Sequence, residues 1–164
     1  MSLDVLFVNP GNHKKIYQDL SKDYSAIETP TWSLLLAESC RSVGYGVAIL
    51  DACAERLTDE QCVERIKEAN PRLICFVVYG QNPNSGTVNM SGTVVMASAI
   101  KKANIDIPIA IVGSHVQALP FETLENEKDI DIVFTNEGVY ALRNLLKQES
   151  LTDVTVLQSV KGIG

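Results

Sequence analysis

Charge is missing from a long stretch in the middle of this 164-residue sequence. From Leu73 to Ile100 there is no Asp, Glu, Lys or Arg, although 21% of the chain is charged. The stretch contains VVYGQNPNSGTVNMSG (77–92), where a β-branched run gives way to Gly, Asn, Pro, Ser and Thr. Charged residues are usually exposed, so a neutral loop at this place predicts contact with a neutral ligand or with another part of a protein.

The sequence also lacks the features of nucleic-acid-binding and membrane proteins. The net charge is −6, and Lys and Arg do not cluster beyond the pairs at 14–15 and 101–102, whereas nucleic-acid binding depends on clustered basic residues. No apolar run reaches the roughly 18–20 residues of a membrane span, and no signal-peptide pattern opens the sequence. We therefore expect a cytoplasmic protein with no nucleic-acid partner and no membrane span.

The four cysteines form no C-x-x-C pattern and no cluster with histidine. Cys40 and Cys62 lie in helical patterns and Cys75 lies in an apolar strand pattern, where a thiol packs as a small hydrophobe. The sequence therefore predicts structural cysteines and no metal ligands.

Apolar runs alternate with helical patterns along the chain. The runs are continuous in polarity, as expected for strands covered on both faces, and they span 3–8, 47–52, 72–79, 107–113 and 129–136. Helical spacing covers 31–46, 57–71, 91–104, 119–127 and 138–148, with Thr58 and Gln61 in capping-box spacing and Pro120 near a first turn. This alternation predicts an α/β domain with a parallel, doubly wound five-stranded sheet.

The segments that follow the strands differ in length from those that precede them. Residues 9–30, 79–92, 113–118 and 136–138 follow predicted strands, and the first two are far longer than the usual ~2–6-residue connection. Ligands of open parallel sheets bind beyond the carboxyl ends of the strands. A binding site is therefore expected at this rim, where both histidines of the chain, His13 and His115, also fall.

Common ligand and catalytic motifs are absent from that rim. There is no G-x-G-x-x-G, no Walker pattern, no flavodoxin-type phosphate loop after the first strand and no acidic cluster at the strand ends. No G-x-S-x-G elbow or carboxylate pair accompanies the histidines. We therefore expect no catalytic residues, and a chain that is not catalytic by itself.

The order of several short motifs resembles the amino-terminal cobalamin-binding domain of cobalamin-dependent radical S-adenosylmethionine enzymes. That family tends to show a V-N-P-P-like strand end, a P-L-G-L-like helix start, a G-G-P-H-A-like turn and a G-E-G-E-like turn. The counterparts here are 8–10, 32–35, 113–115 and 136–138. The neutral stretch YGQNPNSGTVNMSG is similar to the magnesium-protoporphyrin IX monomethyl ester oxidative cyclase-like subset.

The resemblance implies a flavodoxin-like or Rossmann-like cobalamin-binding fold with strand order 2-1-3-4-5. It implies a cobalamin-binding module that positions the cofactor for methyl transfer or oxidative cyclase-type radical chemistry. Many cobalamin domains carry D-x-H-x-x-G after the first strand, and here those positions fall on Gly11, His13 and Ile16. Because the Asp that would orient the histidine is missing, we expect cobalamin to be bound without a protein histidine on cobalt.

Cobalamin is a large, nearly neutral disc fringed with amides, and its partners should be small residues, backbone groups and neutral amides or hydroxyls. The expected cofactor-binding residues combine that chemistry with the family motifs: Asn9, Pro10, His13, Tyr79, Gly80, Gln81, Ser85, Thr87, Gly113, Ser114, His115, Asn136, Glu137 and Gly138.

We expect residues 1–150 to form the cobalamin-binding-like domain. Residues 151–164, with VTVLQSVKGIG, resemble the start of a strand or hairpin leading to a radical S-adenosylmethionine domain, which would hold the iron–sulfur cluster and S-adenosylmethionine. Two alternatives stay open at this point. One is a flavodoxin-like domain for a flavin or another small ligand, and the other is a non-catalytic protein-interaction domain.

Overall fold

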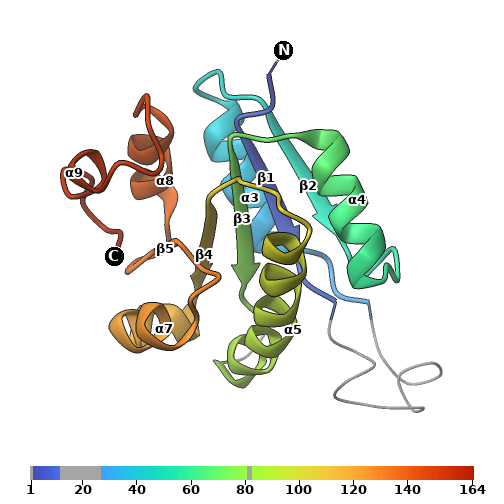
Figure 1. The fold of residues 1–164 in the computed structure, drawn as a ribbon. Coiled ribbons are helices and arrows are strands. Elements are labelled where there is room, and N and C mark those ends of the chain that lie inside the picture. The colour runs from blue at the N-terminus through green and yellow to red at the C-terminus, as the bar shows by residue number, and fades with distance from the viewer. Residues whose placement is uncertain (1, 12–26, 81–82) are drawn as a thin grey trace.

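The computed structural model describes residues 2–11, 27–80 and 83–164. Within these residues, parallel strands form one sheet in the order β2-β1-β3-β4-β5, with helices on both faces (Figure 1). The strands are β1 (Val5–Asn9), β2 (Val47–Asp51), β3 (Leu73–Val78), β4 (Ile109–Gly113) and β5 (Ile132–Val133). The doubly wound fold and the strand order expected above are confirmed.

The continuous apolar runs became strands that are covered on both faces. Every residue of β3 is buried, and along β1 the side chains alternate between two cores. Leu6 and Val8 belong to the core on one face, whereas Val5 and Phe7 belong to the core on the other. A strand with two buried faces has no position for a polar side chain, which explains the unbroken apolar sequence.

Two pairs of helices build those cores. Helices α4 (Asp59–Ala69) and α5 (Pro83–Lys102) contribute buried residues to the first core, and α3 (Thr31–Arg41) and α8 (Val139–Leu146) contribute to the second. Three shorter helices complete the described chain: α6 (Ser114–Ala118), α7 (Pro120–Asn126) and α9 (Val154–Leu157).

The local sequence signals act as predicted. The Thr58 side chain accepts a hydrogen bond from the Gln61 backbone while the Gln61 side chain accepts one from Thr58, so the capping box opens α4. Asn70 ends that helix in the left-handed conformation, at φ 43°. Helix α3 ends at Arg41, earlier than the predicted helix over 31–46, and Gly44, at φ 96°, lies in the turn that follows it.

The neutral stretch after β3 is not the long loop that the sequence predicted. The expectation was a loop over 79–92 and a helix from 91, but α5 begins at Pro83 and continues to Lys102. Asn, Ser and Gly favour loops, and tertiary packing overrides that preference here. Gly86 is buried, and a Cβ added to it would meet the Ser114 hydroxyl and lie 3.2 Å from the Val78 carbonyl oxygen.

The carboxyl-terminal segment also differs from its expectation. Residues 154–157 form the helix α9 and not a strand, because the Asp153 side chain accepts hydrogen bonds from the backbone of Thr155 and Val156 and caps that turn. Residues 162–164 do pair antiparallel beside β5, with the Gly164 backbone amide 2.9 Å from the Val133 carbonyl. Strand β5 is shorter than the predicted 129–136.

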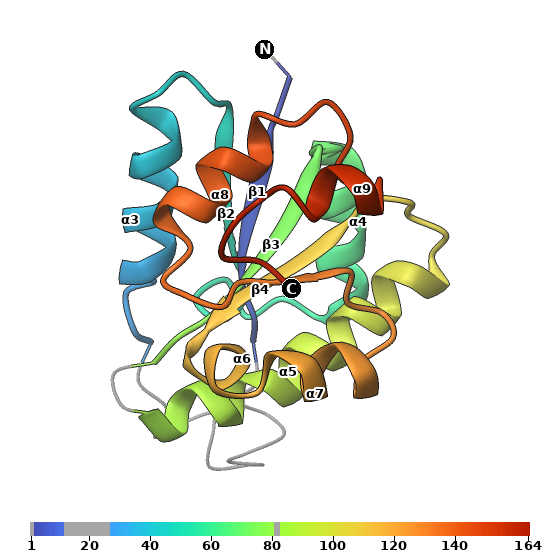
Figure 2. The same ribbon diagram turned by 90° about the vertical axis from the view of Figure 1, so that its left-hand side faces the viewer.

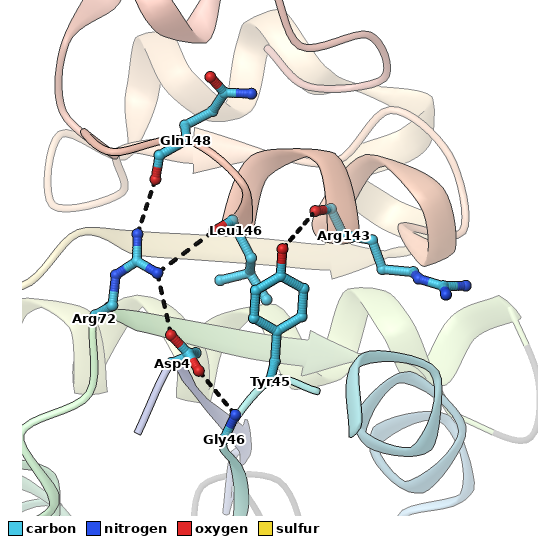
Figure 3. Close-up of polar contacts among 7 residues, drawn as sticks. All are labelled: Asp4, Tyr45, Gly46, Arg72, Arg143, Leu146 and Gln148. Atoms are coloured by element: carbon cyan, nitrogen blue, oxygen red, sulfur yellow. Dashed lines mark hydrogen bonds and ion pairs between the residues drawn. The ribbon is translucent and has the colours of Figure 1, made fainter. Parts of the chain in front are cut away.

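A polar network ties the end of α8 to the amino-terminal end of the sheet (Figure 3). The Arg72 guanidinium lies 3.1 Å from the Asp4 carboxylate and donates to the carbonyls of Leu146 and Gln148 at 3.4 and 2.8 Å. The other Asp4 oxygen accepts the Gly46 amide at 2.8 Å. This network joins three strand beginnings to the end of α8, at the rim opposite the expected site.

Candidate functional site

The carboxyl ends of the parallel strands meet at one rim, and the starts of α5 and α6 lie at the same end of the sheet (Figure 2). Asn9 ends β1 opposite Asp51, which ends β2. The Asn9 amide donates to the Asp51 carboxylate at 2.8 Å, and that same oxygen accepts the Ala54 backbone amide at 3.0 Å. Asp51 therefore fixes both the orientation of Asn9 and the turn after β2.

Asp51 was missed by the sequence reasoning, which assigned a role to Asn9 alone. The signal was present in the pattern. Both residues are the first polar positions after apolar runs, and neighbouring parallel strands bring such positions together at one edge of the sheet.

Small residues bring the ends of β3 and β4 into close contact. A Cβ on Gly113 would collide with the Val78 carbonyl, lying 2.9 Å from its carbon. In helix α5, Gly86 packs against the Ser114 side chain. Gly86 and Gly113 therefore let α5, β3 and the start of α6 approach one another at the rim, and two of the expected site residues, Gly113 and Ser114, take part.

An aromatic pair stands beside these glycines. Trp32, in the first turn of α3, stacks on Tyr79 with ring centroids 4.5 Å apart and planes inclined by 27°. The Gln117 side-chain amide donates to the Tyr79 hydroxyl, and the Asn89 amide donates to the Tyr79 carbonyl at 3.4 Å. Tyr79 is thus held by α3, α5 and α6 together.

The Tyr79 phenol is stabilised in its neutral form. Burial and, to a smaller extent, the negative charge of Glu137 together raise its pKa to about 12, while the hydrogen bond from Gln117 acts in the opposite direction. Trp32 and Gln117 were not among the expected site residues. They are distant from Tyr79 in sequence, and only their shared position after strands on the same rim could have grouped them.

The last part of the rim is the turn between β5 and α8. The Asn136 side chain accepts the Gly138 backbone amide at 2.8 Å, and Gly138 has φ 80°, which an L side chain rarely adopts. Gly162 packs against the Asn136 side chain, where an added Cβ would collide with its amide. Glu137, between Asn136 and Gly138 in the turn, is exposed. The carboxyl-terminal segment therefore supports this turn.

Most of the expected site residues lie along the rim. Pro10 is buried, Gly80 and His115 are half-buried, and Ser85 and Thr87 are backbone positions in the first turns of α5. His13 and Gln81 lie outside the described residues. The structure thus places the following positions along one rim: Asn9, Pro10, Tyr79, Gly80, Ser85, Thr87, Gly113, Ser114, His115, Asn136, Glu137 and Gly138.

The described chain offers little for thiolate or metal chemistry. Burial raises the pKa of the thiols of Cys40, Cys53 and Cys62 to about 11, and raises that of Cys75 further. None of the four forms a disulfide. Within residues 2–11, 27–80 and 83–164, no group of three or more His, Cys, Asp or Glu side chains could hold a metal ion. In the same ranges, no helix is long and apolar enough to cross a membrane.

Fold and rim together define a class of protein, the doubly wound α/β domain, in which the place expected for a ligand lies beyond the carboxyl ends of the strands. Within that class, residues 21–146 match the family described as B12 binding domain. The match extends over more than half of the chain, so the chain belongs to the B12 binding domain family. No curated protein sequence matches it.

Three solved structures with a similar fold are of radical S-adenosylmethionine enzymes. The radical S-adenosylmethionine methyltransferase TsrM from Kitasatospora setae, with cobalamin and a [4Fe-4S] cluster bound, superposes with a TM-score of 0.68 at 18% identity. A second TsrM structure, with tryptophan substrate and a SAM analogue, gives 0.70 at 19% identity. The cobalamin-dependent S-adenosylmethionine radical enzyme OxsB, with aqua-cobalamin bound, gives 0.67 at 18% identity.

These superpositions cover 98–99% of this chain but only 27% and 28% of the two TsrM chains and 20% of the OxsB chain. The chain thus corresponds in fold to one part of larger enzymes. The expected resemblance to cobalamin-binding domains is confirmed by the family match, and the flavodoxin-like alternative gains no support from these comparisons.

Proposed function

We propose that the chain binds cobalamin at the carboxyl rim of its sheet and serves as the cofactor-binding module of a cobalamin-dependent radical S-adenosylmethionine enzyme. The observation that carries this proposal is the family match over residues 21–146. The sheet order 2-1-3-4-5 and the glycine-lined rim agree with it.

The donor set of the rim fits a large neutral cofactor. Amides, hydroxyls and close-packed glycine backbone predominate, and these groups can satisfy the amide fringe of a corrinoid without burying an unpaired charge. Residues proposed to hold cobalamin are Asn9, Pro10, His13, Tyr79, Gly80, Gln81, Ser85, Thr87, Gly113, Ser114, His115, Asn136, Glu137 and Gly138.

The cofactor, when bound, supplies the cobalt-centred chemistry of methyl transfer or of oxidative cyclase-type radical reactions. The residues of this chain bind and orient it, and we propose that no histidine of the chain ligates cobalt. Asn9 would present its amide at the rim in the orientation that Asp51 fixes.

The partner we propose is a radical domain of the same parent protein, which would carry the iron–sulfur cluster and S-adenosylmethionine. The larger size of the relatives of known structure supports this proposal. We place the protein in the cytoplasm, where buried unpaired thiols such as Cys75 stay reduced.

A binding experiment with hydroxocobalamin tests the proposal. The purified chain, mixed with hydroxocobalamin at tens of micromolar, should retain colour through gel filtration with a shifted visible spectrum. Flavin mononucleotide under the same conditions should elute separately. The variant His13→Ala should retain the colour and the spectrum. Colourless wild-type protein would contradict cobalamin binding, and loss of the cobalamin spectrum in His13→Ala would contradict binding without a histidine ligand.

A further inference from the structure

The aromatic pair of Trp32 and Tyr79 forms a contact set with the amide of Gln117. Positions 32 and 79 fall in family-like motifs, but those motifs do not specify the contacts among the three side chains. Trp32 covers one face of the Tyr79 ring, and Gln117 donates to the Tyr79 hydroxyl. Trp32 is 38% exposed and Tyr79 is half-buried, so the pair lies at the surface of the rim and not within the core. The stack and the hydrogen bond together leave the phenol oxygen little freedom to move.

The hydrogen bond from Gln117 determines whether the Tyr79 hydroxyl can act as a donor or as an acceptor toward a ligand. A tyrosine hydroxyl has one donor hydrogen and two acceptor lone pairs. The Gln117 amide uses an acceptor lone pair, so the phenol hydrogen remains a donor, directed away from that amide. Burial and the charge of Glu137 raise the pKa of Tyr79 to about 12, so the hydroxyl stays protonated at neutral pH.

We propose that Tyr79, oriented by Gln117 and held by Trp32, is a specificity-determining residue of the site that donates a hydrogen bond to a neutral carbonyl on the edge of the cofactor. This inference rests on the proposed cobalamin binding and adds a ligand preference to it. The preferred group is an amide carbonyl, such as those of the corrinoid side chains.

Glu137 sets the charge preference of the same place. Glu137 is exposed and precedes Gly138, where an added Cβ would lie 3.1 Å from the Val112 side chain. Val112 of β4 is paired with Val77, two residues before Tyr79. The Glu137 carboxylate therefore lies on the same part of the rim as the phenol, and its charge contributes to the raised pKa of Tyr79. An added carboxylate on the cofactor edge would be repelled by Glu137, whereas an amide of the same shape would not. The site should therefore discriminate between cobalamin and derivatives in which one propionamide is hydrolysed to propionate.

The first test compares two tyrosine variants by titration with hydroxocobalamin, followed by visible absorption. Tyr79→Phe keeps the ring and its stack on Trp32 but removes the donor, and it should weaken binding about three- to tenfold, the effect of one hydrogen bond. Tyr45→Phe is the matched control, because its hydroxyl contacts the Arg143 carbonyl at the opposite rim. It should bind within twofold of wild type.

The second test changes the polarity of Gln117 without changing its shape. In Gln117→Glu the carboxylate can only accept, so the phenol hydrogen turns toward it and away from the cofactor. The loss of affinity should match that of Tyr79→Phe, and the double variant should bind no more weakly than either single one. A merely structural role for Gln117 would give additive losses.

The third test measures charge preference with the separated mono-acid derivatives of hydroxocobalamin. At least one isomer should bind wild type at least threefold more weakly than hydroxocobalamin, and Glu137→Gln should reduce that ratio. If wild type binds hydroxocobalamin and Tyr79→Phe binds it equally, the role of Tyr79 is overturned while cobalamin binding stands. Equal binding of all isomers to wild type would overturn the charge preference. Failure of wild type to bind would overturn the proposed function itself.

Discussion

Substituting Gly113 by Ala should destabilise the fold more than substituting any other glycine with a comparable backbone approach. The added Cβ would lie 2.9 Å from the Val78 carbonyl carbon and 3.0 Å from the Val78 Cβ, and nearer still to the carbonyl oxygen. Both residues belong to the central β3–β4 pairing, where Val78 lies opposite Gly113. The strands must separate by several tenths of an ångström to relieve the collision.

The expected cost follows from these distances. Overpacking of this kind costs about 1–3 kcal/mol, and relief here requires movement of a buried backbone, which favours the upper end. Gly113 has an extended φ of 167°, so alanine gains about 0.4–1 kcal/mol from the unfolded state. The net loss in the free energy of unfolding should be about 2 kcal/mol.

Gly46→Ala is the matched control. A Cβ on Gly46 would meet the Ser2 carbonyl oxygen as closely, with the Ser2 carbon 3.4 Å away, but Ser2 is exposed and precedes β1. The chain start can move, so this variant should lose less than about 1 kcal/mol. Urea denaturation followed by circular dichroism measures both. Equal losses, or a Gly113→Ala variant within about 0.5 kcal/mol of wild type, would refute the reasoning from backbone proximity.

Two further predictions concern the opposite rim and the aromatic pair. Arg72→Met removes an ion pair and two hydrogen bonds to carbonyls, and it should lower the free energy of unfolding by about 2 kcal/mol in the same urea assay. Arg65 and its partner Glu55 are both exposed, so the control Arg65→Met should lower it by less than about 0.5 kcal/mol. Equal losses would contradict the anchoring role of Arg72. Because the pKa of Tyr79 is raised from 10 to about 12, its contribution to stability is complete below pH 10 and disappears as the pH rises through 12. The difference in urea midpoint between wild type and Tyr79→Phe should therefore shrink from pH 9 to pH 11.5, and a constant difference would contradict a raised pKa.

The class of fold could be predicted because the strands are buried on both faces. Their apolar runs are unbroken, and the short returns such as 70–72 between α4 and β3 leave only parallel pairing with helical crossovers. Local capping signals at Thr58 and Asn70 fixed the bounds of α4. The strand order was implied by the family resemblance and not by the residues, since periodicity alone does not say which strands are neighbours.

The start of α5 and the tyrosine contacts could not be predicted, because both depend on tertiary contacts. Gly86 lowers helix propensity, yet it is required where the helix meets Ser114. Trp32 and Gln117 reach Tyr79 from two other elements, and no local pattern records such a meeting. Trp32 covers one face of the Tyr79 ring, and no pattern in the sequence indicated this contact.

The absence of charge between Leu73 and Ile100 has two separate causes. Residues 73–78 form a strand that is buried throughout, and Met90, Thr93, Met96, Ala97 and Ile100 are buried in α5, so most of the neutrality follows from packing. A ligand is needed to explain only the remainder, chiefly 79–89 at the rim. There the Asn89 amide donates to the Tyr79 carbonyl, and the Tyr79 phenol stays protonated under the influence of the Glu137 charge. The proposed recognition of a neutral cofactor edge accounts for neutrality at that place, because a lysine or arginine near Glu137 would cancel the proposed charge preference for an amide over a carboxylate.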